Sequence, residues 1–290
     1  MDSTDTYHIN VNVPTPPAAP NKLNIVTATR ADGWVYNHIP RFVYYIDRYA
    51  GPCKKHIILC VPNTVLTAEA EYIHSQLERY FDVVQVLKEE NHWEDDKTMY
   101  FDQLRATFLD RFGLKEALYL DPDIDILEDM SHLTYTAPAA SLLWVSNTIV
   151  VKNVAEDIQG VGDTDSSLQP IEPGFMYMRK SFANEINEAI AKYPPKTLNS
   201  IPGLFYWEVI KQYEGKKAVQ LPSRYNRTFW DIPGCVKHAG SVHYTGRWKN
   251  IQPYVEYVRE PATDQEPYLH IHPTPIVHEG YEIKKFSDIQ

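Results

Sequence analysis

The chain has 290 residues, of which 43% are hydrophobic and 12% aromatic, and its formal net charge is −10. A chain of this length forms one large domain or two small ones and buries enough surface to need no disulfide or metal for stability. The acidic balance argues against a nucleic-acid duplex as the main partner, because neutralising phosphates requires a basic surface.

Three cysteines, an odd number without the spacing of metal ligands, predict free thiols in a reducing compartment. The sequence contains no run of 18 apolar residues, and its first residues show no basic-then-apolar signal pattern. We therefore expect a cytoplasmic protein without a membrane span. Four prolines between positions 14 and 20 predict a flexible tail over residues 1–20.

Strands and helices are expected to alternate from residue 22 to residue 120. Short β-branched and apolar runs predict strands at residues 23–29, 56–61, 82–87 and 117–120. Apolar residues at helical spacing predict helices at residues 35–49, 67–80 and 98–112. This alternation is typical of βα units around a mostly parallel sheet, so we predict an α/β fold.

The second half of the chain is less regular. The pattern predicts a strand at residues 175–178, helices at 183–193 and 204–213, and then mostly loops with a tail rich in proline, histidine and tyrosine. Because no internal repeat or clear linker is present, we expect one domain over residues 21–260 and a C-terminal extension, 261–290, packed on it. His270, His272 and His278 in that extension lack a further metal ligand, so packing is favoured for them.

An acidic cluster of Asp121, Asp123 and Asp125 follows the predicted strand at 117–120. Open α/β sheets bind ligands at the carboxyl ends of their strands. Two carboxylates at positions i and i+2 can converge on one hard cation and leave coordination positions for phosphate oxygens, whereas the alternative is a solvated loop. An EF-hand is excluded, because it requires Gly and Glu where this chain has Ile126 and His132.

A second group of candidate site residues lies in the segment 242–249. His243 can supply a metal ligand through a neutral imidazole, Lys249 can meet a phosphate as a point charge, and Gly246 lets the backbone approach a ligand closely. A single histidine beside aromatic residues is more often packed or hydrogen-bonded than metal-bound. The acidic cluster upstream makes metal binding the favoured interpretation here.

Taken in order, these motifs resemble the retaining GT-A glycosyltransferases of family 8, the glycogenin and galactosyltransferase group. The resemblance covers about residues 22–250. It implies a GT-A fold, in which a Rossmann-like nucleotide-binding domain has a mostly parallel central sheet and a less regular C-terminal half. The matching positions are Asp121-x-Asp123, Leu221-Pro222 with Asn226, and His243-x-x-Gly246-x-x-Lys249.

The resemblance also implies a reaction and its participants. A hexose would move from a nucleotide sugar, usually a UDP-sugar, to a hydroxyl-bearing acceptor such as a glycan or protein, with retention at the anomeric carbon. Mn²⁺ or Mg²⁺ would bridge the diphosphate. The sequence is also compatible with a homo-oligomer. The implied metal ligands are Asp121, Asp123 and His243, and the implied donor-binding residues are Thr27, Ala28, Thr29, Asp32, Trp34, Arg105, Gly246 and Lys249. Asp125 would be left with a supporting or structural role.

The sequence departs from the family near the expected acceptor side. Glu172-Pro173-Gly174 stands where the family carries Asn-x-Gly, and residues 201–204 lack its Asp-Gln pair. Glu172, favoured here, Glu208 or Asp231 would then replace the missing carboxylate near the anomeric carbon. One alternative is a catalytically weak or inactive nucleotide-sugar-binding protein. The other is a sugar-phosphate nucleotidyltransferase, but residues 29–33 do not contain the Gly-rich signature of that class.

Overall fold

The computed structural model describes residues 22–88, 107–134, 142–146, 171–181, 218–229, 239–244, 246–258 and 268–289. The predicted tail and the predicted helices at 183–193 and 204–213 lie outside these residues. Of the helix expected at 98–112, residues 107–112 are described and are helical. Gly113 follows them with φ +63, a conformation that glycine adopts at the end of a helix.

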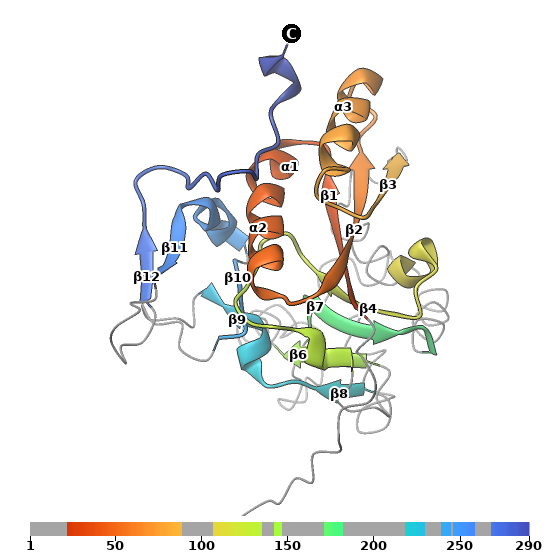
Figure 1. Ribbon diagram of the computed structural model, residues 1–290, viewed down its shortest axis with the longest axis vertical. Coiled ribbons are helices and arrows are strands. Elements are labelled where there is room, and N and C mark those ends of the chain that lie inside the picture. The colour runs from red at the N-terminus through yellow and green to blue at the C-terminus, as the bar shows by residue number, and fades with distance from the viewer. Residues whose placement is uncertain are drawn as a thin grey trace, which may run out of the picture.

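The first part of the chain forms the expected βα units (Figure 1). Their elements are β1 (Leu23–Arg30), α1 (Gly33–Asn37), α2 (Ile39–Tyr49), β2 (Cys53–Val61), α3 (Thr67–Leu77) and β3 (Val83–Lys88). The single helix predicted at 35–49 is wrong in one respect, because it is two helices that meet at His38. Pro40 explains the break, since proline lacks the N–H that a continuous helix needs and fits the first turn of a new one.

The remaining elements extend the sheet and add two small ones. They are β4 (Glu116–Leu120), β5 (Ile124–Ile126), β6 (Leu142–Ser146), β7 (Ile171–Arg179), β8 (Ala218–Gln220), β9 (Arg227–Thr228), β10 (Ser241–His243), β11 (Val255–Val258) and β12 (Tyr268–Ile271). The central sheet has the order β3-β2-β1-β4-β7-β6-β8. Only β7 runs against its neighbours, so the predicted mostly parallel α/β sheet is confirmed.

Buried side chains fix the positions of β1 and β4 in the core. Ile25 of β1 and Leu118 of β4 are register partners, and both belong to one core cluster with Phe42 of α2 and Ile73 of α3. All four side chains are at most 1% exposed, and burying each one contributes about 1.5–3 kcal/mol. The segment that follows β4 therefore starts from a rigid, well-packed position.

A small sheet brings distant sequence to the end of β4. In the order β5-β10-β9, Ile124 is the antiparallel partner of His243. The backbone N–H of Tyr244 also donates to the carbonyl oxygen of Asp123 at 2.9 Å. The acidic cluster and the segment 242–249, which the sequence analysis treats as separate motifs, are thus neighbours in space.

The C-terminal segment crosses the helices of the first βα units (Figure 1). His278 stacks on Tyr44 of α2 with ring centroids 3.7 Å apart, and Ile283 is buried in the main core. The Tyr80 hydroxyl donates to the carbonyl oxygens of Gly280 and Glu282. Among the residues that the structure describes, no helix is long and apolar enough to cross a membrane.

Candidate metal and nucleotide site

Three predicted metal ligands converge at the end of β4. One ligand atom from each of Asp121, Asp123 and His243 lies within 4.8 Å of the other two. The two aspartates occupy the turn between β4 and β5, and His243 ends β10 beside Ile124. The pairing of β5 with β10 is therefore the structural cause of the convergence.

Asp123 is buried, with 1% of its surface exposed, and it carries an unusual environment. His243 Nε2 lies 3.4 Å from Asp123 Oδ1, and Lys249 Nζ lies 3.3 Å from Asp123 Oδ2, yet within the described part of the chain neither oxygen has a well-aligned hydrogen bond. Burial raises the pKa of this carboxyl, but Lys249 and His243 outweigh burial and hold the pKa below its ordinary value of 3.8. The group is therefore an ionised, buried carboxylate with free coordination capacity.

Gly174 on β7 provides space for the cluster. Its carbonyl oxygen accepts a hydrogen bond from the Asp121 N–H at 2.8 Å. A Cβ at this position would lie 2.7 Å from His243 Cε1 and 2.9 Å from Asp121 Oδ2, which no side chain tolerates without displacing them. This role was not predicted from the sequence, although a glycine inside a strand pattern often marks a close approach of another group to the backbone.

The three side chains fit a divalent cation. Two carboxylates offer hard oxygen ligands and an imidazole offers nitrogen, a set that suits Mn²⁺ or Mg²⁺. Bound there, such an ion would take up the unused lone pairs of Asp123. The space beside Gly174 points to the same use, because any side chain at this position would press against Asp121 and His243.

Asp125, two residues further on, is saturated, which means that protein donors already use the hydrogen-bonding capacity of its oxygens. Arg41 Nη2 donates to its Oδ2 at 2.7 Å, Gln252 Nε2 donates to its Oδ1 at 3.0 Å, and the Tyr257 hydroxyl donates to its Oδ2 at 2.7 Å. Arg41 Nε also lies 3.1 Å from both oxygens. Asp125 is completely buried, and its partners hold together α2, β5 and the segment 252–257. This agrees with the structural role expected for it.

Lys249 joins the metal ligands to the predicted nucleotide residues. It lies in the short 3-10 helix η6 (Gly246–Asn250), and its Nζ is 4.9 Å from the centroid of the Trp34 ring. Asp32 caps α1, with its Oδ1 accepting from the Trp34 N–H at 2.9 Å. The structure thus brings Asp32, Trp34 and Lys249 to the edge of the sheet where Asp123 lies.

The three predicted nucleotide-binding residues of β1 occupy its buried second half. Thr27, Ala28 and Thr29 are 0%, 1% and 2% exposed. The hydroxyls of both threonines are buried and have no hydrogen-bond partner within the part of the chain that is described. Their role in nucleotide binding stays a prediction.

For several predicted site residues, the structure describes no contact with the metal ligands. Arg105, Glu208 and Asp231 lie outside the described residues. Glu172 lies in β7, two residues before Gly174, and Gly246 begins η6. Catalytic roles for Glu172, Glu208 and Asp231 remain predictions.

Sequence reasoning also missed His38 and Gln252. The His38 ring stacks on Trp34 with centroids 4.2 Å apart, and its Nδ1 lies 2.6 Å from Gln252 Oε1. Neither residue belongs to a motif, and the apolar spacing over residues 35–49 predicts a continuous helix through His38. The only available signal was Pro40, which predicts a helix start just after His38.

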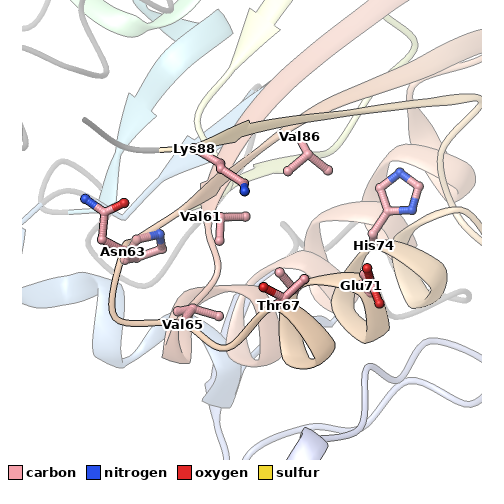
Figure 2. A pocket seen from close by; sticks show the side chains of 10 residues that line it. Val61, Asn63, Val65, Thr67, Glu71, His74, Val86 and Lys88 are labelled. Carbon is pink, nitrogen blue, oxygen red and sulfur yellow. The ribbon is translucent and has the colours of Figure 1, made fainter. Parts of the chain in front are cut away.

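Two pockets flank the βα units. One, of about 480 Å³, lies beside His38 and Lys249. The other, of about 530 Å³, lies between the ends of β2 and β3 and helix α3 (Figure 2). Figure 2 shows Val61, Val86 and Lys88 from the strands facing Thr67 and Glu71 from α3. None of the predicted site residues that the structure describes lines this second pocket.

Comparison with known proteins identifies the fold. No protein-family model and no curated protein matches the sequence. The solved structure of the galactosyltransferase LgtC, in complex with donor and acceptor sugar analogs, matches with a TM-score of 0.55 and 12% identity over 80% of this chain and 89% of LgtC. The bifunctional glycosyltransferase WbbM matches with a TM-score of 0.52 and 11% identity over 80% of this chain and 47% of WbbM. The chain therefore has the α/β fold of the GT-A glycosyltransferases.

Proposed function

We propose that the protein is a metal-dependent glycosyltransferase of the retaining family 8 type. It moves a hexose from a nucleotide sugar, a UDP-sugar, to a hydroxyl-bearing acceptor such as a glycan or protein. The observation that carries this proposal is the convergence of Asp121, Asp123 and His243, with Lys249 beside them, at a strand end of a GT-A fold.

Asp121, Asp123 and His243 would hold Mn²⁺ or Mg²⁺. When bound, the cation supplies Lewis-acid neutralisation of the diphosphate leaving group. Lys249 adds a fixed positive charge at the same place, and its position between Asp123 and Trp34 is set before the donor arrives. A charge placed in advance stabilises the developing negative charge without reorganisation.

The donor would extend from this centre in two directions. Its nucleoside would lie on the side of Trp34 and Asp32, where the aromatic ring and Lys249 adjoin. Its hexose would lie toward β7, where Gly174 leaves room beside Asp121. Glu172, close to Gly174 in sequence, is our first candidate for the carboxylate near the anomeric carbon, ahead of Glu208 and Asp231.

A thermal-shift screen of nucleotide sugars with and without Mn²⁺ tests the proposal, because a bound ligand stabilises the folded protein in proportion to the logarithm of its concentration over Kd. We expect a Mn²⁺-dependent shift with UDP-sugars that is lost in Asp123→Ala. The matched control is Glu78→Ala, since Glu78 is 60% exposed and distant in sequence from the metal ligands. A shift that survives Asp123→Ala would contradict the metal assignment.

Turnover separates an enzyme from a binding protein. Donor hydrolysis or transfer, measured with Mn²⁺ and with Mg²⁺, should accompany the binding. If UDP-sugars bind and no turnover occurs with either metal, the chain is an inactive nucleotide-sugar-binding protein, as the missing Asp-Gln pair suggests.

A further inference from the structure

A chain of three buried side chains fixes the hydrogen on the His38 ring. Asp125, ion-paired with Arg41, only accepts hydrogen bonds, so the group facing it from Gln252 is the amide NH₂, at 3.0 Å. The other end of the same amide is then Oε1, an acceptor, which lies 2.6 Å from His38 Nδ1. His38 Nδ1 therefore carries a hydrogen and donates it to Gln252.

This arrangement leaves the second ring nitrogen as an acceptor. Burial lowers the pKa of His38 from its ordinary value of 6.5, so the ring is neutral at neutral pH. A neutral imidazole has one N–H, and here it is on Nδ1. Nε2 keeps its lone pair, and within the described part of the chain the only hydrogen bond of the His38 ring is the one to Gln252.

The contact with Gln252 directs Nδ1 of the His38 ring to one side and leaves Nε2 on the other side of the ring. The two ring nitrogens point in nearly opposite directions, and Nδ1 points inward to Gln252, which is completely buried. The His38 ring lines the 480 Å³ pocket together with Tyr36, Asn37 and Lys249. Stacking on Trp34 holds the plane of the ring. A ligand in this pocket therefore meets an acceptor whose position and tautomer are already set.

The pocket adjoins the candidate site at Lys249 and His38, which both lie beside the Trp34 ring. Lys249 forms part of its wall, and the Nζ of the same residue is 3.3 Å from Asp123. Pro253, Tyr254 and residues of the C-terminal segment 275–288 also line the pocket. A diphosphate held by Lys249 and the metal would thus lead its nucleoside past Trp34 to His38.

We propose that His38 Nε2 accepts a hydrogen bond from a ribose hydroxyl of the donor nucleotide, in a subsite that the C-terminal segment 275–288 closes. This inference rests on the proposed function, because it takes the ligand to be a nucleoside diphosphate sugar. A buried acceptor left without a partner costs free energy, so such a site discriminates against analogues that lack the hydroxyl. Asp125 and Gln252 act as positioning residues, since they set the tautomer of His38.

The test compares the binding of UDP, 2′-deoxy-UDP and 3′-deoxy-UDP in the presence of Mn²⁺, measured by calorimetry. In the native protein we expect UDP to bind about tenfold or more tightly than one of the two deoxy analogues. In His38→Phe, which keeps a ring on Trp34 and removes both nitrogens, that ratio should fall to about one. A ratio of affinities cancels any general weakening of the variant.

Two further measurements keep the test valid if His38→Phe does not fold. His38→Asn retains an amide near the position of Nδ1, facing Gln252, and loses Nε2, so it should also abolish the discrimination. In the native protein, long-range ¹H–¹⁵N spectra should show hydrogen on Nδ1 and none on Nε2. The Nε2 resonance should move with UDP and not with the analogue that lacks the contacted hydroxyl.

The outcomes separate this inference from the proposed function. If UDP and UDP-sugars do not bind with Mn²⁺, both the proposed function and the inference fail. If UDP binds and neither deoxy analogue is discriminated, or if the discrimination persists in both His38 variants, the inference alone is overturned. A hydrogen on Nε2 in the spectra would overturn it as well.

Discussion

Asp123 and Asp125 are two buried carboxylates, two residues apart, in opposite environments. Asp125 accepts hydrogen bonds from Arg41, Gln252 and Tyr257. Among the residues that the structure describes, Asp123 has no well-aligned hydrogen bond, and its oxygens lie 3.3 and 3.4 Å from Lys249 and His243. Burial alone therefore does not distinguish a functional carboxylate from a structural one. The distinction lies in whether the surrounding protein already uses its lone pairs.

The backbone explains the difference. Asp125 lies inside β5, where it pairs with Val242 and faces the packed cluster around Tyr45 and Tyr257. Asp123 lies in the turn before β5, where the described donors nearest its oxygens, Lys249 and His243, form no well-aligned hydrogen bond with them. The same residue type in one motif thus serves stability at one position and ligand binding at the other.

The largest expected effect comes from breaking the saturated carboxylate. Asp125→Ala leaves Arg41 buried and without its ion-pair partner, so we expect a loss of about 3–5 kcal/mol in the free energy of unfolding, measured with urea. Asp123→Ala should cost clearly less in the absence of metal, because its oxygens have no well-aligned hydrogen bond among the described residues and its partner Lys249 is 35% exposed to solvent. Equal costs for the two variants would contradict the comparison.

The second effect concerns the space beside the unsaturated carboxylate. Gly174→Ala places a Cβ within 3 Å of both His243 and Asp121, and we expect Mn²⁺ affinity to fall about 10–100-fold. Titration of Mn²⁺ followed by electron paramagnetic resonance measures this loss. Gly33→Ala is the matched control, because its Cβ would meet nothing nearer than 3.9 Å. Similar losses in both variants would show that the effect is not local to the metal ligands.

The smallest expected effect comes from placing another charge, on His278, beside the Arg41–Asp125 pair. His278 packs on Tyr44 and Tyr45 beside the Arg41–Asp125 pair, and burial, with Arg41, lowers its pKa from 6.5 to about 4. Below about pH 6.5 the unfolded chain binds a proton here that the folded protein does not, so stability falls as the pH falls toward 4. The full shift corresponds to about 3 kcal/mol, and because His278 is only half-buried, solvent screening reduces the expected loss to about 2 kcal/mol.

The measurement for His278 is urea unfolding across this pH range. His278→Phe keeps a ring on Tyr44 without a titrating group, and its stability should fall less between about pH 6.5 and pH 4. Parallel pH profiles for the native protein and the variant would show that His278 is not held neutral.

Local sequence patterns predicted the strands of the first βα units closely. The runs at 23–29, 56–61, 82–87 and 117–120 fall within or almost within β1, β2, β3 and β4. Buried parallel strands are continuous apolar runs, so their signal is strong. The helix at 35–49 was predicted as one element because its apolar spacing is continuous, although Pro40 divides it.

Non-local features were harder to predict. The place of β7 between β4 and β6 depends on pairing across the sheet, and no local pattern encodes it. The positioning of His38 by Gln252 joins residues that are 214 positions apart in the chain. Neither the helix-like pattern around His38 nor the single glutamine at position 252 predicts that contact.

The sequence by itself determined the α/β class and the residue types of a candidate cation site, because periodicity and acidic spacing are local properties. It did not determine which carboxylates are free to bind. Only the tertiary structure decided that Asp125 is saturated and Asp123 is not, because both facts depend on side chains supplied by α2, β10 and the segments after it. Folding thus separates the carboxylates of the acidic cluster into structural and ligand-binding ones, since a carboxylate binds a cation only where the fold has left its oxygens unused.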